Sequence, residues 1–509
     1  MDFTRIPNSP QITRNRRGRR SRASVAASAT ALVAVLTLTG AALTGCSPAT
    51  NSAVSSSTAQ PAAEAAALPD SPLGTQAAWL LDALNGDIEA IDIDAGISER
   101  FTAQMTEEVS VSVLRQGIEQ LQEQGPWRVD EVEDAGTQAV ITLRPAEGDA
   151  LDMQIVVDAE GLVSGLLFTP SAADRVAATS WEELEEAVES FAADTTMVVT
   201  EVDPEAADLV GERLLETGDP TAVHPSGSMF KLYVLGAVAD AVAAGTLTWE
   251  TPLTITDDIK SLPSGVLQDE PSGTTVTLRE AAGKMISISD NTATDLLIAT
   301  VGPEAVEAAF ADMGHHNPSL NSPLITTRGL FQLGWGSQGE GGTAGAGADS
   351  EAGEAESRAD IRERWSEGDE AERQAIVDAL PGGAVTVEPT DLTDSVWQLG
   401  LDWFTSADDL VAAHVALQQR AATDAGAPVG EILAENPGLG AIGEEWSTVA
   451  FKGGSSIGVL AGSWYLERES DGKAFVISIQ GETLTPTDLA DTSTFFGQVE
   501  DAVALLAAG

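Results

Sequence analysis

The sequence predicts an α+β protein with two folded parts that differ in their pattern of secondary structure. Across residues 71–175, apolar residues first recur at helical spacing and then alternate along short segments, which is typical of helices followed by a meander of strands. Across residues 180–509, apolar helical runs precede an alternating segment around Lys452. A length of 509 residues leaves room for two or three domains.

The amino terminus has the layout of an export signal. Residues 14–22 are rich in arginine, and residues 23–45 are small, apolar and uncharged, which is the order of the regions of a signal peptide. The run ends in LTGC, which resembles a bacterial lipobox, and Cys46 is the single cysteine of the chain. We therefore expect residues 1–46 to be a lipoprotein signal peptide with Cys46 as the lipidated residue. A transmembrane helix with an incidental cysteine is the alternative.

The segment after Cys46 predicts a tether. Residues 47–70 are rich in Ser, Ala and Pro, a composition that favours a flexible chain over a packed one. A lipid anchor at one end of this tether would hold the folded parts outside the cytoplasmic membrane. We therefore expect an extracytoplasmic, membrane-anchored lipoprotein, and a monomer.

Composition excludes several classes of function. The chain has 79 acidic and 26 basic residues and a formal net charge of −53, so a nucleic acid would be repelled. A single cysteine permits no intramolecular disulfide and no cysteine-based metal centre, and four histidines leave little for another metal site. The glycine motifs that bind phosphates or dinucleotides are missing from the sequence. We therefore expect no nucleic-acid partner, no metal and no cofactor.

The first folded part, residues 71–175, places helical segments before strand segments. Helical spacing covers residues 73–86 and 97–124, and residues 157–162 predict a hairpin turn within the alternating region. This order resembles the cystatin-like or steroid-isomerase-like (NTF2-like) cone fold. Such a cone can hold a ligand or catalyse a reaction, but we favour the simpler interpretation of a spacer or docking module.

Ser228 and Lys231 form an S-x-x-K motif at the start of an apolar helical run. Residues three apart on a helix share one face. Partial burial and the positive end of the helix lower the pKa of such a lysine, and a neutral amine can remove the proton of a hydroxyl one turn away. The pair therefore predicts a serine nucleophile activated without histidine, although this motif alone is common.

Two further short motifs follow along the chain. S-D-N at residues 289–291 lies between two helical segments, where a hydroxyl can relay a proton and an amide can hold a substrate amide. K-G-G-S at residues 452–455 lies in an alternating segment that predicts a strand, and its glycines let a substrate approach the backbone. Taken singly, each motif also fits ordinary turn or strand-end chemistry.

The three motifs in this order resemble the signature of class A β-lactamases and penicillin-binding proteins. The segments GSMFKLYVLGAV and REAAGKMISISDNTATDLL resemble the sequences of class A enzymes. The resemblance covers residues 195–335 and 385–509. It implies a β-lactamase/transpeptidase-like domain, with a five-stranded antiparallel sheet flanked by helices, at residues 180–509. The two-part layout is similar to actinobacterial proteins that fuse a steroid-isomerase-like domain to such a domain.

The resemblance implies a role for each motif residue. The catalytic residues are Ser228 as the acylated nucleophile, Lys231 as its general base and Ser289 as the proton relay. The substrate-binding residues are Asn291 as a ligand of the substrate amide, Lys452 as an electrostatic anchor, and Gly454 and Ser455 on the strand. The backbone N–H groups of Ser455 and Ser228 would form an oxyanion hole. The implied partner is a small molecule, namely a β-lactam, an ester or a cell-wall peptide.

The sequence departs from the class A pattern at two positions. Hydrolysis of the acyl-enzyme in that class needs a glutamate in an E-x-x-L-N loop, and the best match here is NPSLN, with Asn317 in place of the glutamate. An amide cannot accept the proton of water as a carboxylate can, so we expect impaired deacylation. Gly453 replaces the hydroxyl residue of K-T/S-G that would bond a substrate carboxylate. An ester or a neutral amide therefore fits better than an anionic substrate.

An insert separates the second and third motifs. Residues 336–358, rich in Gly, Ala and Glu, predict a disordered acidic loop, and residues 359–380 predict a pair of helices. Ser406 is expected to cap the helix that follows it. These elements either cover the active site as a lid or decorate the surface. We expect His315 and His316 to be loop residues rather than metal ligands.

Three functions are compatible with these observations. A serine hydrolase that forms an acyl-enzyme on Ser228 is favoured, because the whole motif set is present. A penicillin-binding or sensing lipoprotein with slow or no turnover is the alternative, supported by the thin set of groups for a substrate carboxylate. A scaffold with a dead site is disfavoured, because it has no chemical need for these residues.

Overall fold

The computed structural model describes most of the chain beyond residue 65. The described residues are 66–509 except 87–91, 110, 123, 135, 147, 149, 172–174, 192, 207–209, 263, 337–356, 384, 386, 388–393, 440–442, 444, 486–488 and 490–491. The predicted signal peptide with Cys46, most of the predicted tether and most of the predicted acidic loop lie outside the described residues. Among the helices that are described, none has the length and apolar character needed to cross a membrane.

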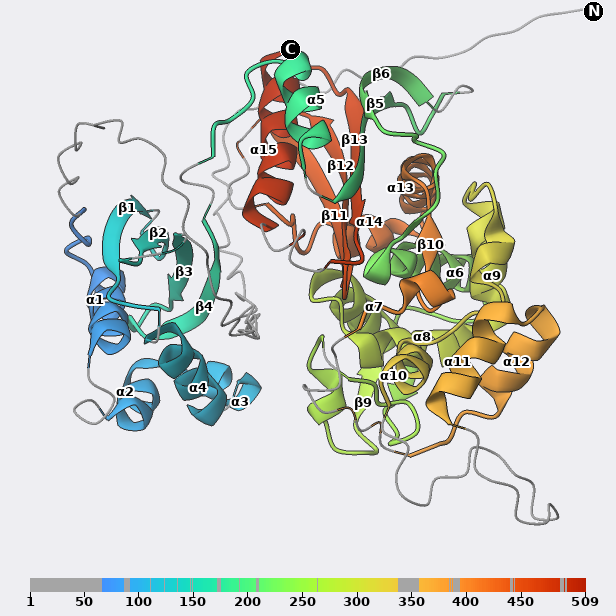
Figure 1. Ribbon diagram of the computed structural model, residues 1–509, viewed down its shortest axis with the longest axis horizontal. Coiled ribbons are helices and arrows are strands. Elements are labelled where there is room, and N and C mark those ends of the chain that lie inside the picture. The colour runs from blue at the N-terminus through green and yellow to red at the C-terminus, as the bar shows by residue number, and fades with distance from the viewer. Residues whose placement is uncertain are drawn as a thin grey trace, which may run out of the picture.

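The first folded part consists of short helices followed by a four-stranded antiparallel sheet (Figure 1). The helices are α1 (Pro72–Asn85), α2 (Ile93–Arg100), α3 (Ala103–Glu108) and α4 (Val111–Gln122), and the strands are β1 (Arg128–Asp134), β2 (Gln138–Arg144), β3 (Leu151–Val157) and β4 (Val163–Pro170). The strands follow one another in the sheet in chain order. This is the helices-then-meander order that the sequence predicts, whereas the resemblance to a cystatin-like cone stays a prediction.

The helical segment expected at residues 97–124 is three helices rather than one. Phe101 leaves the helical path to form a bridge with Val163 of β4, and the Thr102 side chain then caps α3 by accepting the N–H of Met105. Tertiary pairing therefore overrides the local helical spacing at this point. The part has its own apolar core, in which Leu80 of α1 packs with Ile141 of the sheet.

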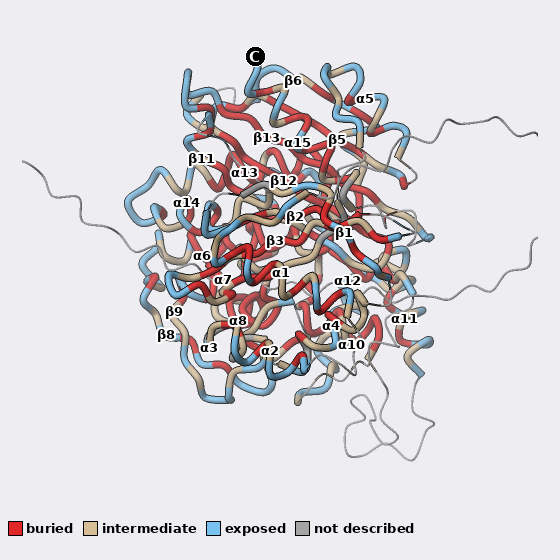
Figure 2. Tube along the Cα trace, turned by 90° about the vertical axis from the view of Figure 1, so that its left-hand side faces the viewer, coloured by how far each residue is buried: buried red, intermediate tan, exposed pale blue. Residues whose placement is uncertain are grey.

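The second folded part is built on a five-stranded antiparallel sheet in the order β11-β12-β13-β5-β6. The strands are β5 (Asp194–Val202), β6 (Val210–Thr217), β11 (Trp446–Ser456), β12 (Val459–Arg468) and β13 (Ala474–Glu482). Strands β11, β12 and β13 thus extend the sheet from β5, on the side away from β6. Most residues of β5, β12 and β13 are buried (Figure 2), as expected for a sheet covered on both faces.

Helices cover the two faces of this sheet, and the helical domain that carries the motifs extends from one of them (Figure 1). One face packs against α5 (Trp181–Glu189) and α15 (Thr492–Ala508). The other side holds α6 (Lys231–Ala243), α7 (Leu278–Ser287), α8 (Asn291–Val301), α9 (Pro303–Asp312), α10 (Thr327–Gly334), α13 (Ala407–Ala421) and α14 (Ala427–Leu433). Side chains alternate between the two faces along β5. Met197 and Val199 lie in the core with α5 and α15, whereas Val198 lies in the core on the other face.

Short elements complete the second part. The two-residue strands β7 (His224–Pro225) and β10 (Phe404–Thr405) pair, as do β8 (Pro252–Thr254) and β9 (Thr275–Thr277). The 3-10 turns are η1 (Gly227–Phe230), η2 (Leu267–Asp269), η3 (Pro318–Asn321) and η5 (Trp397–Leu399). The helix pair predicted after the acidic loop is present as α11 (Arg358–Glu367) and α12 (Glu370–Asp378), and Ser406 caps α13 as expected.

A buried ion pair joins the segment after β4 to the C-terminal helix. The guanidinium of Arg175 donates two hydrogen bonds to the carboxylate of Asp501 in α15, and the N–H of Ala178 donates a third to the same carboxylate. The side chain of Asp501 is 4% exposed. This carboxylate therefore ties the connection between the two folded parts to the body of the second.

We expect Asp501→Ala to lower the free energy of unfolding by about 3 kcal/mol, because removal of one partner leaves a charge of a largely buried pair without compensation. Thermal and denaturant unfolding measure the loss. Glu431→Ala is the matched control, since it breaks the exposed pair with Arg279 and should change the same quantity by less than about 1 kcal/mol. Equal losses in the two variants would contradict the structural role of Asp501.

Candidate active site

Ser228 lies in the 3-10 turn η1, immediately before α6 begins at Lys231. The sequence predicted that both residues share one α-helix, but the hydroxyl residue precedes that helix by one tight turn. The turn is held from outside the helix, because Ser226 donates its N–H and its hydroxyl to the carbonyl of Trp403. The ring of Phe230, at the end of the turn, also stacks on the Trp403 ring with centroids 3.7 Å apart.

A cavity of about 650 Å³ brings the three motifs together. Its lining includes Ser228, Ser289, Asn291, Lys452, Gly454 and Ser455, all of which the sequence singled out. These residues come from η1, from the turn between α7 and α8, and from β11. The seventh predicted site residue, Lys231, is fully buried and contacts the cavity wall through the S-D-N segment.

The turn that carries Ser228, η1 with the preceding Ser226, is in close backbone contact with β11; it is called the nucleophile turn below, after the predicted role of Ser228. A Cβ on Gly454 would lie 2.0 Å from the carbonyl oxygen of Ser226, and a Cβ on Gly227 would lie 2.7 Å from the backbone nitrogen of Ser455. Gly227 also has a φ of +51°, a conformation that L residues with side chains rarely adopt. Glycine at these two positions is therefore what allows the turn with Ser228 to approach the strand with Ser455.

The hydroxyl of Ser289 lies between two lysine amines. It is 3.0 Å from Nζ of Lys231 and 3.0 Å from Nζ of Lys452. Lys231 also donates to the Ser289 carbonyl and to Oδ1 of Asn291, at 2.5 and 2.7 Å. A protonated amine has three N–H donors for the Ser289 carbonyl, the Asn291 amide and the Ser289 hydroxyl, and the loss of one proton leaves a lone pair that can accept another. The three side chains thus form a chain along which a proton can pass.

Burial sets the charge of both lysines. Lys231 is fully buried, and this burial lowers its pKa to about 7 even though the carboxylates of Asp290 and Asp295 act to raise it. Lys452 is 2% exposed, and burial, followed by the neighbouring charge of Lys231, lowers its pKa well below the ordinary value. Two amines around one hydroxyl in a buried site favour the loss of at least one proton at neutral pH.

The S-D-N turn has an unusual backbone. Ser289 has a φ of +57° and is the non-glycine residue with positive φ in the described part of the chain. The carboxylate of Asp290 holds the turn, since it accepts the N–H of Ala293 at the start of α8 and the N–H groups of Val266 and Leu267 in the facing loop. The left-handed conformation aims the Ser289 hydroxyl between the two amines, at a cost in backbone strain.

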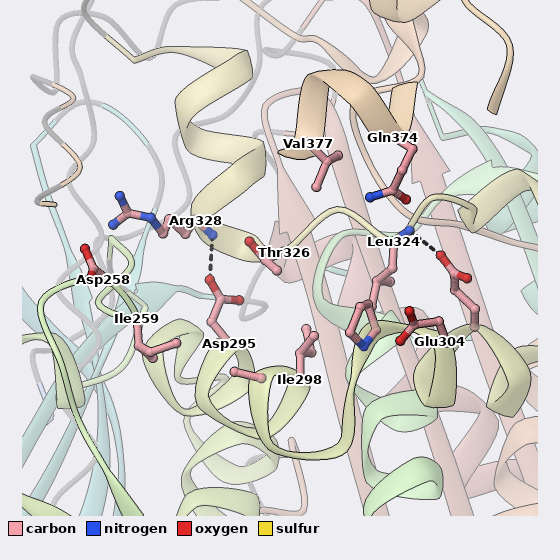
Figure 3. A pocket seen from close by; sticks show the side chains of 13 residues that line it. Asp258, Ile259, Asp295, Ile298, Glu304, Leu324, Thr326, Arg328, Gln374 and Val377 are labelled. Atoms are coloured by element: carbon pink, nitrogen blue, oxygen red, sulfur yellow. Dashed lines mark hydrogen bonds between the residues drawn. The ribbon is translucent and has the colours of Figure 1, made fainter. Parts of the chain in front are cut away.

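A carboxylate that sequence reasoning missed lies under this site. Asp295 of α8 is 4% exposed and lines a second cavity, of about 290 Å³. Figure 3 shows its side chain directed toward the backbone N–H of Arg328, and Thr327 donates to it as well. Burial raises the pKa of Asp295 to about 6 against these hydrogen bonds. Its position four residues after Asn291, on the same helix face, is the signal that could have found it.

A second missed carboxylate holds the nucleophile turn. Asp402 accepts the N–H of Gly227 through Oδ1 and the hydroxyl of Ser456 through Oδ2, both at 2.8 Å. It therefore bonds both to the turn with Ser228 and to the end of β11. Burial raises its pKa to about 6. No local pattern could have revealed this residue, because it lies far from Ser228 along the chain.

The loop that the sequence aligned with E-x-x-L-N lies elsewhere. Asn317 precedes η3, where its side chain accepts the hydroxyl of Ser319, and it is not among the described residues that line the cavity with Ser228. The described lining of that cavity contains no carboxylate at all. Asn317 therefore does not line the cavity that contains Ser228, and the match of NPSLN to a catalytic loop stays a prediction.

His315 and His316 meet Asp409 in a group whose ligand atoms lie within 4.8 Å of one another. Both ring nitrogens of His315 already bond to the backbone, Nε2 to the carbonyl of Phe404 and Nδ1 to the N–H of Asn317. The carboxylate of Asp409 also completes the cap of α13 with Ser406. These hydrogen bonds fit the expected loop role and leave His315 no free ring nitrogen for a metal.

The comparisons with known proteins agree with the motif order. Residues 182–358 match the model of the β-lactamase enzyme family, and residues 68–163 match the model described as ORF 12 gene product N-terminal. The first of these matched ranges includes the S-x-x-K and S-D-N motifs and ends before K-G-G-S.

The comparison with solved structures matches β-lactamases and a PBP at low sequence identity. A β-lactamase from Sphaerobacter thermophilus is 19% identical, with 65% of this chain and 97% of that chain covered and a TM-score of 0.43. A representative class A β-lactamase from Bacteroides cellulosilyticus is 15% identical, with 64% and 97% covered and a TM-score of 0.43. The structure of PBP-A is 16% identical, with 64% and 94% covered and a TM-score of 0.41.

Acylation of Ser228 should depend on the protonation of Lys231. Burial lowers the pKa of this amine to about 7, and only the neutral amine can accept a proton. The rate of acylation should therefore rise as the pH increases through about 7 and level off above it, as measured with a covalent serine probe between pH 5 and pH 9. A rate that is flat across this range would contradict Lys231 as the base.

Two substitutions at Ser289 should separate strain from chemistry. Ser289→Gly and Ser289→Ala both remove the hydroxyl between the amines, so both should lose acylation. Glycine tolerates the φ of +57° and alanine does not, so the glycine variant should be more stable to unfolding than the alanine variant by about 1 kcal/mol. Equal stability of the two variants in denaturant unfolding would show that the turn is unstrained.

Proposed function

We propose that the protein is a serine hydrolase of the class A β-lactamase type that forms an acyl-enzyme on Ser228. Its substrates are β-lactams, esters or cell-wall peptide amides. The observation that carries the proposal is the Ser289 hydroxyl, 3.0 Å from both lysine amines, in the wall of the cavity that also contains Ser228. The β-lactamase-family match over residues 182–358 supports the same chemistry.

Acylation follows from these groups. The Oγ of Ser228 attacks the substrate carbonyl, and its proton passes to the neutral amine of Lys231. The backbone N–H groups of Ser228 and Ser455 stabilise the negative charge on the carbonyl oxygen. The C–N or C–O bond then breaks, and Ser289 passes a proton, replaced from a lysine amine, to the leaving nitrogen or oxygen. Asn291 and the strand at Gly454 hold the substrate.

Deacylation is the weaker half of the cycle. Water must attack the ester on Ser228 to release a carboxylic acid and restore the hydroxyl, and a base must take a proton from that water. The described lining of the cavity offers no carboxylate for this task. Lys231 is the group left for it, so turnover is slow. The missing carboxylate also supports the second candidate function, a penicillin-binding or sensing protein whose acyl-enzyme persists.

The cell location is part of the proposal. The export signal, the LTGC sequence and the Ser/Ala/Pro-rich residues after it support a lipoprotein attached through Cys46 outside the cytoplasmic membrane. In that place the protein meets cell-wall peptides and antibiotics before they reach the membrane. The folded part at residues 71–175 would serve as a spacer or docking module.

Intact-protein mass spectrometry of the full-length protein tests this function. A penicillin and a cephalosporin are added separately, and the mass is followed over time. We expect an adduct with the mass of the whole penicillin that persists, because acylation opens the lactam ring without loss of atoms and deacylation lacks a carboxylate.

Ser228→Ala is the control and should show no adduct. A transient adduct with hydrolysed product would favour an efficient β-lactamase instead. Absence of an adduct with both compounds would remove β-lactams from the substrates and leave esters and peptides to be tested.

A further inference from the structure

An aromatic ring fills the position where a hydroxyl side chain would meet a substrate carboxylate. Gly453 follows Lys452 in β11 and has no side chain. A Cβ on Gly453 would lie 2.9 Å from Cζ of Phe451, so the Phe451 ring covers this residue from two positions back along the strand. Residues two apart on a strand share one face, and that face is part of the cavity lining.

This ring belongs to a packed aromatic wall. Phe451 stacks on Trp464 with ring centroids 4.8 Å apart, and Phe496 of α15 meets the edge of the same tryptophan at 6.1 Å. Trp464 is fully buried, so it fixes both phenylalanines from behind. Gly462 pairs with Gly453 across the strands, and a Cβ there would lie 2.4 Å from the Trp464 ring. Because Gly453 and Gly462 lack side chains, the three rings have the space that they occupy.

The rest of the cavity is also poor in charge. Among the described residues that line it, Lys452 is the sole titratable side chain, and its amine donates to the Ser289 hydroxyl and to the carbonyl of Gly453. The other lining side chains include Val266, Ile286, Ile288, Phe331 and Leu460. A net charge of −53 also repels anions at a distance. Besides Lys452, a substrate carboxylate would meet only neutral hydroxyl and amide groups among the polar side chains of the described lining, and burial of a charge without a paired charge is costly.

We propose that this cavity selects uncharged acyl substrates that carry an aromatic group, and that it discriminates against the anionic forms of the same compounds. The proposal rests on the proposed acylation of Ser228 and names the substrate class of that site. The aromatic group of the substrate packs on the wall of Phe451 and Phe496, where ring–ring contact adds to apolar burial. The reacting carbonyl then lies between Ser228 and β11.

The test uses a penicillin and its methyl ester, in which a methyl group removes the charge of the carboxylate. Penicillin G and its methyl ester are each mixed with the full-length protein, and the rate of Ser228 acylation is followed by intact mass. We expect the methyl ester to acylate about tenfold faster or more, because the free acid must bury its carboxylate. A free acid that reacts as fast as the ester, or faster, would overturn the proposal.

A second pair keeps the test decisive if neither penicillin reacts. 4-Nitrophenyl phenylacetate and 3-carboxy-4-nitrophenyl phenylacetate transfer the same acyl group and differ by one carboxylate on the leaving group. A faster reaction of the neutral ester would support the selection while removing β-lactams from the proposed function. A faster reaction of the anionic ester would overturn the selection, and no reaction with any of the four compounds would overturn both.

Variants test the aromatic wall itself. Phe451→Ala should slow acylation by penicillin G methyl ester but not by the corresponding 6-acetamido ester, which lacks the ring. Phe191→Ala, in a ring that packs on Phe495 and is not among the residues lining the cavity, is the matched control. Equal losses with both esters in the Phe451 variant would contradict a specific aromatic contact.

A double variant tests the carboxylate position. Gly453→Thr combined with Phe451→Ala adds a hydroxyl after Lys452 and removes the ring that a Cβ at this position would strike. The rate ratio of methyl ester to free acid should fall several-fold in this variant. A ratio that stays at the value of the unmodified protein would show that Gly453 and Phe451 do not set the charge preference.

Discussion

The arrangement of the site depends on the burial of one amine, that of Lys231, beside a serine hydroxyl. Burial lowers the pKa of this amine to about 7, so a substantial fraction of it is neutral at neutral pH and has a lone pair that can accept a proton. The surrounding structure supports this burial, because α6 starts at Lys231 and lies in the centre of the helical domain. The positive φ of Ser289 and the cap made by Asp290 place the partner hydroxyl at the amine.

Carboxylates hold the surrounding backbone without entering the cavity. Asp290 fixes the S-D-N turn, Asp295 joins α8 to α10, and Asp402 bonds the nucleophile turn to the end of β11. All three are buried, in a chain with a large excess of acidic residues. Each carboxylate fixes the N–H or O–H groups that donate to it. Apart from Lys452, the described lining of the cavity itself consists of apolar and neutral groups. The proposed acylation thus has candidate groups at this cavity, whereas its described lining holds no carboxylate to activate a water.

The sequence by itself determined the three motifs that meet at the cavity and the order of the main elements. The seven site residues that the family resemblance implies lie at or beside one cavity, and the segments that carry them are a turn before a helix, a turn between helices and a strand. The five-stranded sheet and the helix pair at residues 359–380 also follow from local periodicity and the family resemblance. Such features can be predicted from the sequence because each depends on residues that are close together along the chain.

Only the tertiary structure decided which distant residues complete the site. Asp402 reaches Gly227, and the ring of Phe451 covers Gly453, through packing that no spacing rule describes. The same holds for Asn317, whose loop resembles a catalytic loop in sequence but lies outside the described lining of the cavity. A short loop match carries little information about position, because the path of a loop is set by the elements that it contacts rather than by its own residues.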